Sequence, residues 1–153
     1  MSKSPIVSFV RANALYLAWV QALIAMLGSL FFSEVMKLPP CVLCWYQRIC
    51  MYPLVVILGV GILFEDKRVK AYALPLSIIG LVIAAIHNLL YYGILPEAMS
   101  PCVAGISCTS KTIMWLGFIT IPLLSLVAFT VITLALLIYK KNDVHPIKGI
   151  EAK

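Results

Sequence analysis

Charged residues are scarce in this chain, and their scarcity excludes a protein that is surrounded by water on all sides. Only 12% of the 153 residues are Asp, Glu, Lys or Arg, whereas 63% are hydrophobic. A soluble domain of ordinary composition carries about 25% charged residues. The composition therefore predicts an integral membrane protein, and the length fits one compact domain.

The few charges divide the chain into uncharged stretches at 12–33, 49–64, 71–96 and 112–139. A helix needs about 20 apolar residues to cross a bilayer, and the second stretch is too short on its own. That helix must borrow residues from "CVLCWYQR", which places Arg48 inside the membrane boundary. We expect an all-α fold, an up-down four-helix bundle in a single membrane domain, 1–153. The predicted helices span about 12–33, 43–64, 71–93 and 113–139, with external loops at about 34–42 and 94–112.

The first hydrophobic stretch lacks the features of a removable signal peptide. Its apolar core exceeds the roughly 7–15 residues of a signal h-region. The segment that follows, "GSLFFSEVMK", contains no A-x-A-like cleavage site. We therefore expect this stretch to stay as a membrane helix.

Lysine and arginine are distributed unevenly between the two sides of the predicted bundle. One side has only Lys37 and Lys111. The other side, which includes both termini, has nine: Lys3, Arg11, Lys67, Arg68, Lys70, Lys140, Lys141, Lys148 and Lys153. Because positive loops stay in the cytoplasm, both termini are predicted to be cytoplasmic, in a multi-pass protein of the cell membrane. The net charge of +6 then reports orientation and contact with anionic lipid. Basic residues scattered at helix ends argue against a nucleic-acid partner.

Five cysteines are present, and four of them fall on the predicted external side, where disulfides persist. These four are Cys41 and Cys44, at the start of the second helix, and Cys102 and Cys108, in the longer external loop. Cys50 falls within the second helix and is expected to be a small buried apolar residue.

The stretch "PPCVLCWYQRIC" places two thiols and a fixed positive charge at the start of an apolar helix. Cys41 would lie at the first helical turn, where the helix dipole favours a thiolate. Cys44 and Arg48 follow on the same stripe, and a guanidinium at that depth is costly without a partner. A zinc site shared with Cys102 and Cys108 is one alternative, although the loops contain no histidine. Snorkelling of Arg48 to the headgroups is another.

The second cysteine pair, in "PCVAGISC", can close a small disulfide loop. A small exposed loop favours labile exchange, although an inert bridge that ties the loop down is the alternative. Four cysteines allow three connectivities, including a crossed one between the two pairs, and sequence does not choose among them.

His87 lies at membrane depth towards the external end of the third helix. An ionisable group there suggests function, and the equal alternative is that His87 and Asn88 are both packed into the bundle by hydrogen bonds. Tyr91 and Tyr92 are expected to be interface anchors rather than site residues. Pro53 and Pro122 are expected to kink the second and fourth helices.

Together these features resemble the DsbB family of membrane thiol–quinone oxidoreductases, also called disulfide bond formation protein B. The resemblance rests on four helices, "PCVLCWYQR" leading into the second, a cysteine pair between the third and fourth, and His87. It covers nearly the whole chain, and the short second pair is similar to Gram-positive, Bdb-type members. Two departures are Gln47, where some members have an acidic residue, and the close spacing of Cys102 and Cys108.

The resemblance implies a role for each of these residues. Cys41 and Cys44 would be the quinone-proximal pair, with Arg48 and His87 near the quinone, which the Gram-positive likeness suggests is menaquinone rather than ubiquinone. Cys102 and Cys108 would form the disulfide that a reduced, DsbA-like thioredoxin-fold partner attacks, through Cys102. Such a protein is an enzyme that supports disulfide formation in exported proteins.

The physical chemistry of such a relay is consistent with this arrangement, since a lipid-soluble quinone arrives through the bilayer and a soluble partner arrives from outside. Two other classes of protein remain open. A vitamin K epoxide reductase-like enzyme also has a C-x-x-C in a helix bundle, but there that motif follows the loop pair. A tetraspan scaffold or metal-handling protein with inert external disulfides is the non-enzymatic alternative.

Overall fold

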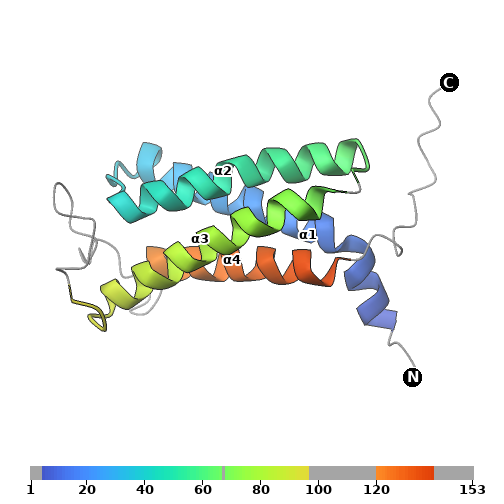
Figure 1. Ribbon diagram of the computed structural model, residues 1–153. Helices are drawn as coiled ribbons and strands as arrows, with labels where there is room; N and C mark the ends of the chain where they lie inside the picture. The colour runs from blue at the N-terminus through green and yellow to red at the C-terminus, as the bar shows by residue number, and fades with distance from the viewer. Residues whose placement is uncertain (1–4, 67, 97–119, 140–153) are drawn as a thin grey trace.

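A computed structural model describes residues 5–66, 68–96 and 120–139, and all its regular elements are helices (Figure 1). The helices are α1 (Pro5–Leu30), α2 (Val42–Leu63), α3 (Val69–Tyr91) and α4 (Ile121–Ile138), and a short π-helix, η1 (Phe31–Val35), extends α1. Four segments are long and apolar enough to cross a membrane: Asn13–Val35, Val42–Leu63, Val69–Tyr91 and Ile121–Ile138. The expected all-α membrane fold is confirmed.

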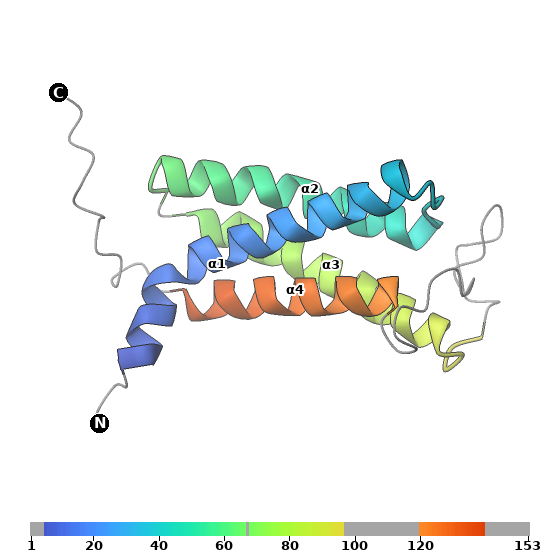
Figure 2. The ribbon, with the colours of Figure 1, turned by 180° about the vertical axis from the view of Figure 1, so that it is seen from behind.

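The four helices lie alongside one another, and successive helices run in opposite directions (Figures 1 and 2). Each of α1 and α3 packs against both α2 and α4. The first residues of α1, the turn between α2 and α3, and the last residues of α4 lie at one end. The start of α2 and the last turn of α3 lie at the other end. Which end faces the cytoplasm stays a prediction from the charges.

The bundle is held together by a core of aliphatic side chains and one aromatic ring. Leu54, Leu58, Ile132 and Leu136 are fully buried, and Phe129 is nearly so. Phe129 packs where α3 and α4 approach closely, since a Cβ on Gly80 would overlap its Cε1 atom. Many other apolar side chains are exposed, as expected for a surface in contact with lipid. Examples are Ile24, Leu27, Val56, Leu63 and Ile79.

Helix α4 is described from Ile121 onwards. The expected start was about residue 113; residues 113–119 lie outside the described part, and Thr120 caps the helix. Its backbone is extended, and its hydroxyl accepts a hydrogen bond from the Leu123 amide at 3.3 Å. Pro122 follows in the first turn, where its missing N–H costs nothing. The expected kink at Pro122 is therefore wrong, because this proline helps to begin the helix.

Candidate functional site

Cys41 and Cys44 meet at the N-terminus of α2. Cys41 follows two prolines and has an extended backbone, so it becomes the N-cap of the helix. Its Sγ accepts a hydrogen bond from the Cys44 amide at 3.4 Å, and it lies 2.9 Å from the Cys44 Sγ. Both are free thiols, and Cys41 is buried. The arrangement brings two sulfurs together where unpaired helix amides favour a negative charge.

The site stabilises Cys41 as a thiolate. The hydrogen bond with the Cys44 side chain is the largest cause, and together with the bond from His87 it lowers the pKa of Cys41 to about 4, against the opposing effect of burial. A thiolate rather than a thiol is the nucleophile in disulfide exchange. Cys41 is therefore in its reactive form at neutral pH when the pair is reduced.

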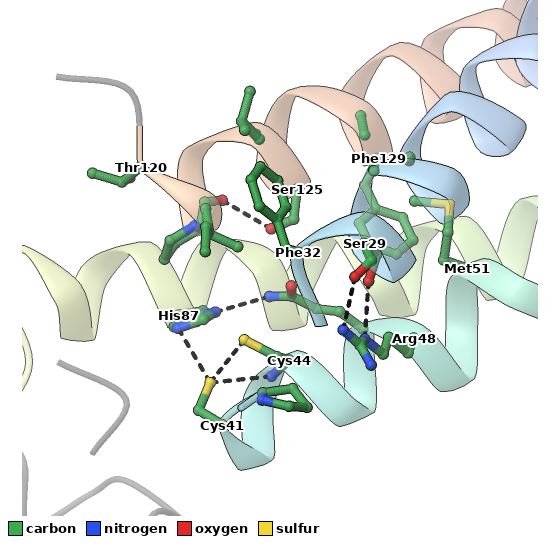
Figure 3. A pocket seen from close by; sticks show the side chains of 18 of the residues that line it. Ser29, Phe32, Cys41, Cys44, Arg48, Met51, His87, Thr120, Ser125 and Phe129 are labelled. Carbon is green, nitrogen blue, oxygen red and sulfur yellow. Dashed lines mark hydrogen bonds between the residues drawn. The ribbon is translucent and has the colours of Figure 1, made fainter. Parts of the chain in front are cut away.

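His87 approaches the sulfurs from α3, in the last turns of that helix (Figure 3). Its side chain is 2% exposed, and its Nε2 atom lies 3.7 Å from the Cys41 Sγ. On its other side, the Nε2 atom of Gln47 lies 3.1 Å from the His87 Nδ1 atom. Asn88 is also buried and donates to the Ala84 and Pro122 carbonyls, so both residues are packed into the bundle by hydrogen bonds, as the alternative expected.

Cys41, Cys44 and His87 form a group that could hold a metal ion. Within the described ranges, the ligand atoms of Cys41, Cys44 and His87 form a cluster in which all lie within 4.8 Å of one another. Two thiolates and an imidazole suit a soft ion such as zinc. The shared zinc site weighed from the sequence needs Cys102 and Cys108, which lie outside the described residues.

Arg48 turns towards α1 and takes its partners there. Its Nε donates to the Ser29 Oγ at 2.9 Å, and its Nη2 donates to the Ser29 carbonyl at 3.0 Å. The guanidinium also lies 5.5 Å from the centre of the Trp45 ring. No carboxylate accepts from it in the part of the chain that the structure describes. The partner that the sequence required for a cation at membrane depth is therefore a serine at the end of α1.

A cavity of about 320 Å³ opens beside the dithiol, between the ends of the four helices (Figure 3). Its wall is mostly apolar, with Ile24, Phe32, Leu124, Ala128 and Phe129 among the lining residues. The polar lining includes both cysteines, Gln21, Ser29, Gln47, Arg48, Tyr52, His87 and Tyr91. The hydroxyls of Tyr52 and Tyr91 are buried and have no hydrogen-bond partner among the described residues. The cavity thus combines a mostly apolar wall with polar side chains, two of which have hydroxyls without a partner among the described residues.

The structure brings four of the six predicted site residues to this cavity: Cys41, Cys44, Arg48 and His87. Cys102 and Cys108 lie outside the described residues. Cys50 is buried in the core, as expected.

Sequence reasoning missed several residues of the wall. Ser29, Gln47 and Tyr52 were not predicted as site residues, and Tyr91 was expected at the membrane interface. The only pattern that pointed to Ser29 or Gln47 was a polar residue within an apolar segment.

A bundle of membrane-spanning helices with a C-x-x-C pair at a helix N-terminus, one thiol held as a thiolate, is the architecture of a membrane thiol–disulfide oxidoreductase. Comparison with known proteins agrees. The family model described as "Disulfide bond formation protein DsbB" matches residues 11–139. The chain belongs to this family, whose activity is disulfide bond formation at the membrane.

Three relatives illustrate the likeness. "Disulfide bond formation protein C" of Bacillus subtilis is 52% identical over 85% of this chain and 94% of its own length. "Probable disulfide formation protein C 2" of Bacillus cereus is 47% identical over 88% of this chain and 95% of its own length. "Probable disulfide formation protein" of Metapseudomonas resinovorans is 44% identical over 85% of this chain and 91% of its own length. No solved structure matches the chain significantly.

Proposed function

We propose that this chain reoxidises a reduced thioredoxin-fold thiol oxidase outside the cytoplasmic membrane and passes the electrons to a quinone. The proposed path runs from the partner to Cys102 and Cys108, then to Cys41 and Cys44, and then to the quinone. The observation that carries the proposal is the cavity where the dithiol meets Arg48 and His87 between membrane-spanning helices.

The residues of the cavity fit a quinone headgroup. A ring with two carbonyl oxygens needs an apolar pocket with a few donors, and pockets for small molecules start at about 300 Å³. The unpartnered hydroxyls of Tyr52 and Tyr91 are such donors, and Arg48 adds a charged one. We propose that these three side chains hold the headgroup. Menaquinone is favoured over ubiquinone by the likeness to Gram-positive members of the family.

Electron balance follows from the chemistry of the two pairs. Reduced Cys102 and Cys108 exchange with the disulfide between Cys41 and Cys44, so that the loop pair is oxidised and the helix pair is reduced. Closing the bond between the Cys41 thiolate and the Cys44 thiol again releases two electrons and the Cys44 proton. A bound quinone would take up both electrons and this proton, and its second proton would come from solvent. Because Cys41 is already a thiolate, its proton does not have to leave during this step.

The orientation of the relay is proposed from the charge distribution. The lysine-poor end carries the start of α2 and would face outwards, where the soluble partner is found. Cys41 at that end lies at the membrane boundary, which both a lipid-soluble and a water-soluble reactant can reach.

The test uses the full-length protein, reduced and placed in lipid nanodiscs without quinone. Menaquinone or ubiquinone analogues are added, and the thiols of Cys41 and Cys44 are counted with a maleimide mass tag. The proposal predicts that both thiols disappear as quinol forms, faster with the menaquinone analogue. Cys44→Ala is the control and should form no quinol. If the thiols persist while quinone is in excess, the proposed function is wrong.

A further inference from the structure

Three buried side chains form a chain of contacts from α2 to α3 and back. Gln47 is 7% exposed, His87 is 2% exposed and Cys41 is 8% exposed. The Gln47 Nε2 atom meets the His87 Nδ1 atom, and the His87 Nε2 atom meets the Cys41 Sγ. The imidazole therefore has a different neighbour at each nitrogen, and water reaches neither freely.

The identity of these atoms determines where the imidazole proton lies. An amide nitrogen has two N–H donors and no lone pair to offer, so it can only donate. The His87 Nδ1 atom must then accept, which means that it carries no proton. A neutral imidazole has its single N–H on the other nitrogen. That nitrogen is Nε2, which faces the Cys41 sulfur.

We propose that Gln47 is a positioning residue that holds His87 in the Nε2–H tautomer, so that the imidazole donates to the Cys41 thiolate. The amide occupies the Nδ1 lone pair, so protonation of His87 requires this bond to break. In this arrangement the imidazole donates from its Nε2 atom to Cys41 while its Nδ1 atom accepts from Gln47. In this tautomer its Nε2 atom is neither a general base towards Cys41 nor a metal ligand.

Among the described residues that line the cavity, only His87 approaches the Cys41 Sγ with an imidazole nitrogen. The titratable or charged residues that line it are Cys44, Arg48 and Tyr52 from α2 and Tyr91 from α3, besides Cys41 and His87 themselves. The described residues of α1 and α4 that line it contribute only uncharged, non-titrating side chains. The Cys44 Sγ lies 2.9 Å from the Cys41 Sγ, a contact that does not involve His87. The His87 contribution can therefore be separated from that of Cys44 by substituting Gln47.

The tautomer can be measured directly because the chain has only two histidines, His87 and His145. In a His145→Gln protein labelled with ¹⁵N-histidine, reduced and in nanodiscs, one imidazole remains. The proposal predicts a protonated Nε2 and an unprotonated Nδ1 for His87 at neutral pH. Gln47→Leu should give a mixture of tautomers, because its side chain fills similar space without a donor. A protonated Nδ1 in the protein with Gln47 would overturn the proposal.

A second measurement asks whether Gln47 acts through His87. The pH dependence of iodoacetamide alkylation at Cys41 is followed by mass spectrometry in the reduced protein. Gln47→Leu should raise the apparent pKa of Cys41 by about one unit, slowing alkylation at low pH by about tenfold. In a His87→Ala protein, Gln47→Leu should not change the apparent pKa of Cys41 further. A shift that persists without His87, or no shift at all, contradicts the proposal.

The matched control removes an amide from the same cavity without touching His87. Gln21→Leu, on α1, should leave the alkylation profile of Cys41 unchanged. If Gln21→Leu shifts the profile as Gln47→Leu does, the polarity of the cavity rather than the His87 tautomer determines the apparent pKa of Cys41. Because these measurements use no quinone, they are independent of the proposed electron path, and a failure of one leaves the other standing.

Discussion

Arg48→Ala should weaken quinone use much more than it weakens the fold. The guanidinium has five N–H donors, of which Ser29 accepts from two, so three remain for a ligand in the cavity. Loss of one hydrogen bond from a charged donor costs about 2 kcal/mol. At about 1.4 kcal/mol per factor of ten, the apparent KM for quinone should rise about 30-fold. The assay is the rate of quinol formation by the reduced protein in nanodiscs over a range of quinone concentrations.

Two control variants make this prediction sharp. Arg48→Lys keeps the charge but cannot reach both Ser29 atoms and the cavity in one geometry. Its KM for quinone should therefore lie between that of the unsubstituted protein and that of Arg48→Ala. Arg68→Ala removes an arginine near the opposite end of the bundle, at the start of α3, and should change nothing. An unchanged KM in Arg48→Ala would refute the reasoning. Arg48 would then only extend its guanidinium to the lipid headgroups.

Three further substitutions have defined outcomes. Tyr91→Phe removes a buried hydroxyl that has no partner among the described residues. It should raise the KM for quinone several-fold without lowering the melting temperature. A lower melting temperature at constant KM would argue against a ligand contact. Gly80→Ala should destabilise the bundle by about 1–3 kcal/mol in thermal unfolding, because its new methyl meets the Phe129 ring, whereas Gly28→Ala has open space and should not. Cys50→Ala should leave turnover nearly intact, and lost turnover would show a role in the relay.

The helices could be predicted from charge because of a single strong physical constraint. A charged side chain in hydrocarbon is costly, so uncharged stretches mark the membrane spans. The described start of α4 at Ile121 does not follow from this argument, since the last charge before it is Lys111. The capping group of Thr120 and the proline that follows it set the start instead.

The site could be predicted only where residues close in sequence make it. Cys41 and Cys44 are three residues apart, and a helix N-terminus brings them together whatever the rest of the chain does. The partner of Arg48 is 19 residues away and that of Gln47 is 40, so each depends on how the helices rotate against one another. Tyr91 suits either the interface or the cavity by composition. The orientation of α3 decides, and places it in the wall.

The measurement that tests the relay most directly is thiol trapping in cells that can be depleted of quinone. A bulky maleimide counts the free thiols of Cys41, Cys44, Cys102 and Cys108, with and without the thioredoxin-fold partner. The account predicts that these cysteines accumulate as thiols when quinone is depleted and the partner is present, and return to disulfides when quinone is restored. Cysteines that stay fully oxidised throughout quinone depletion would contradict it.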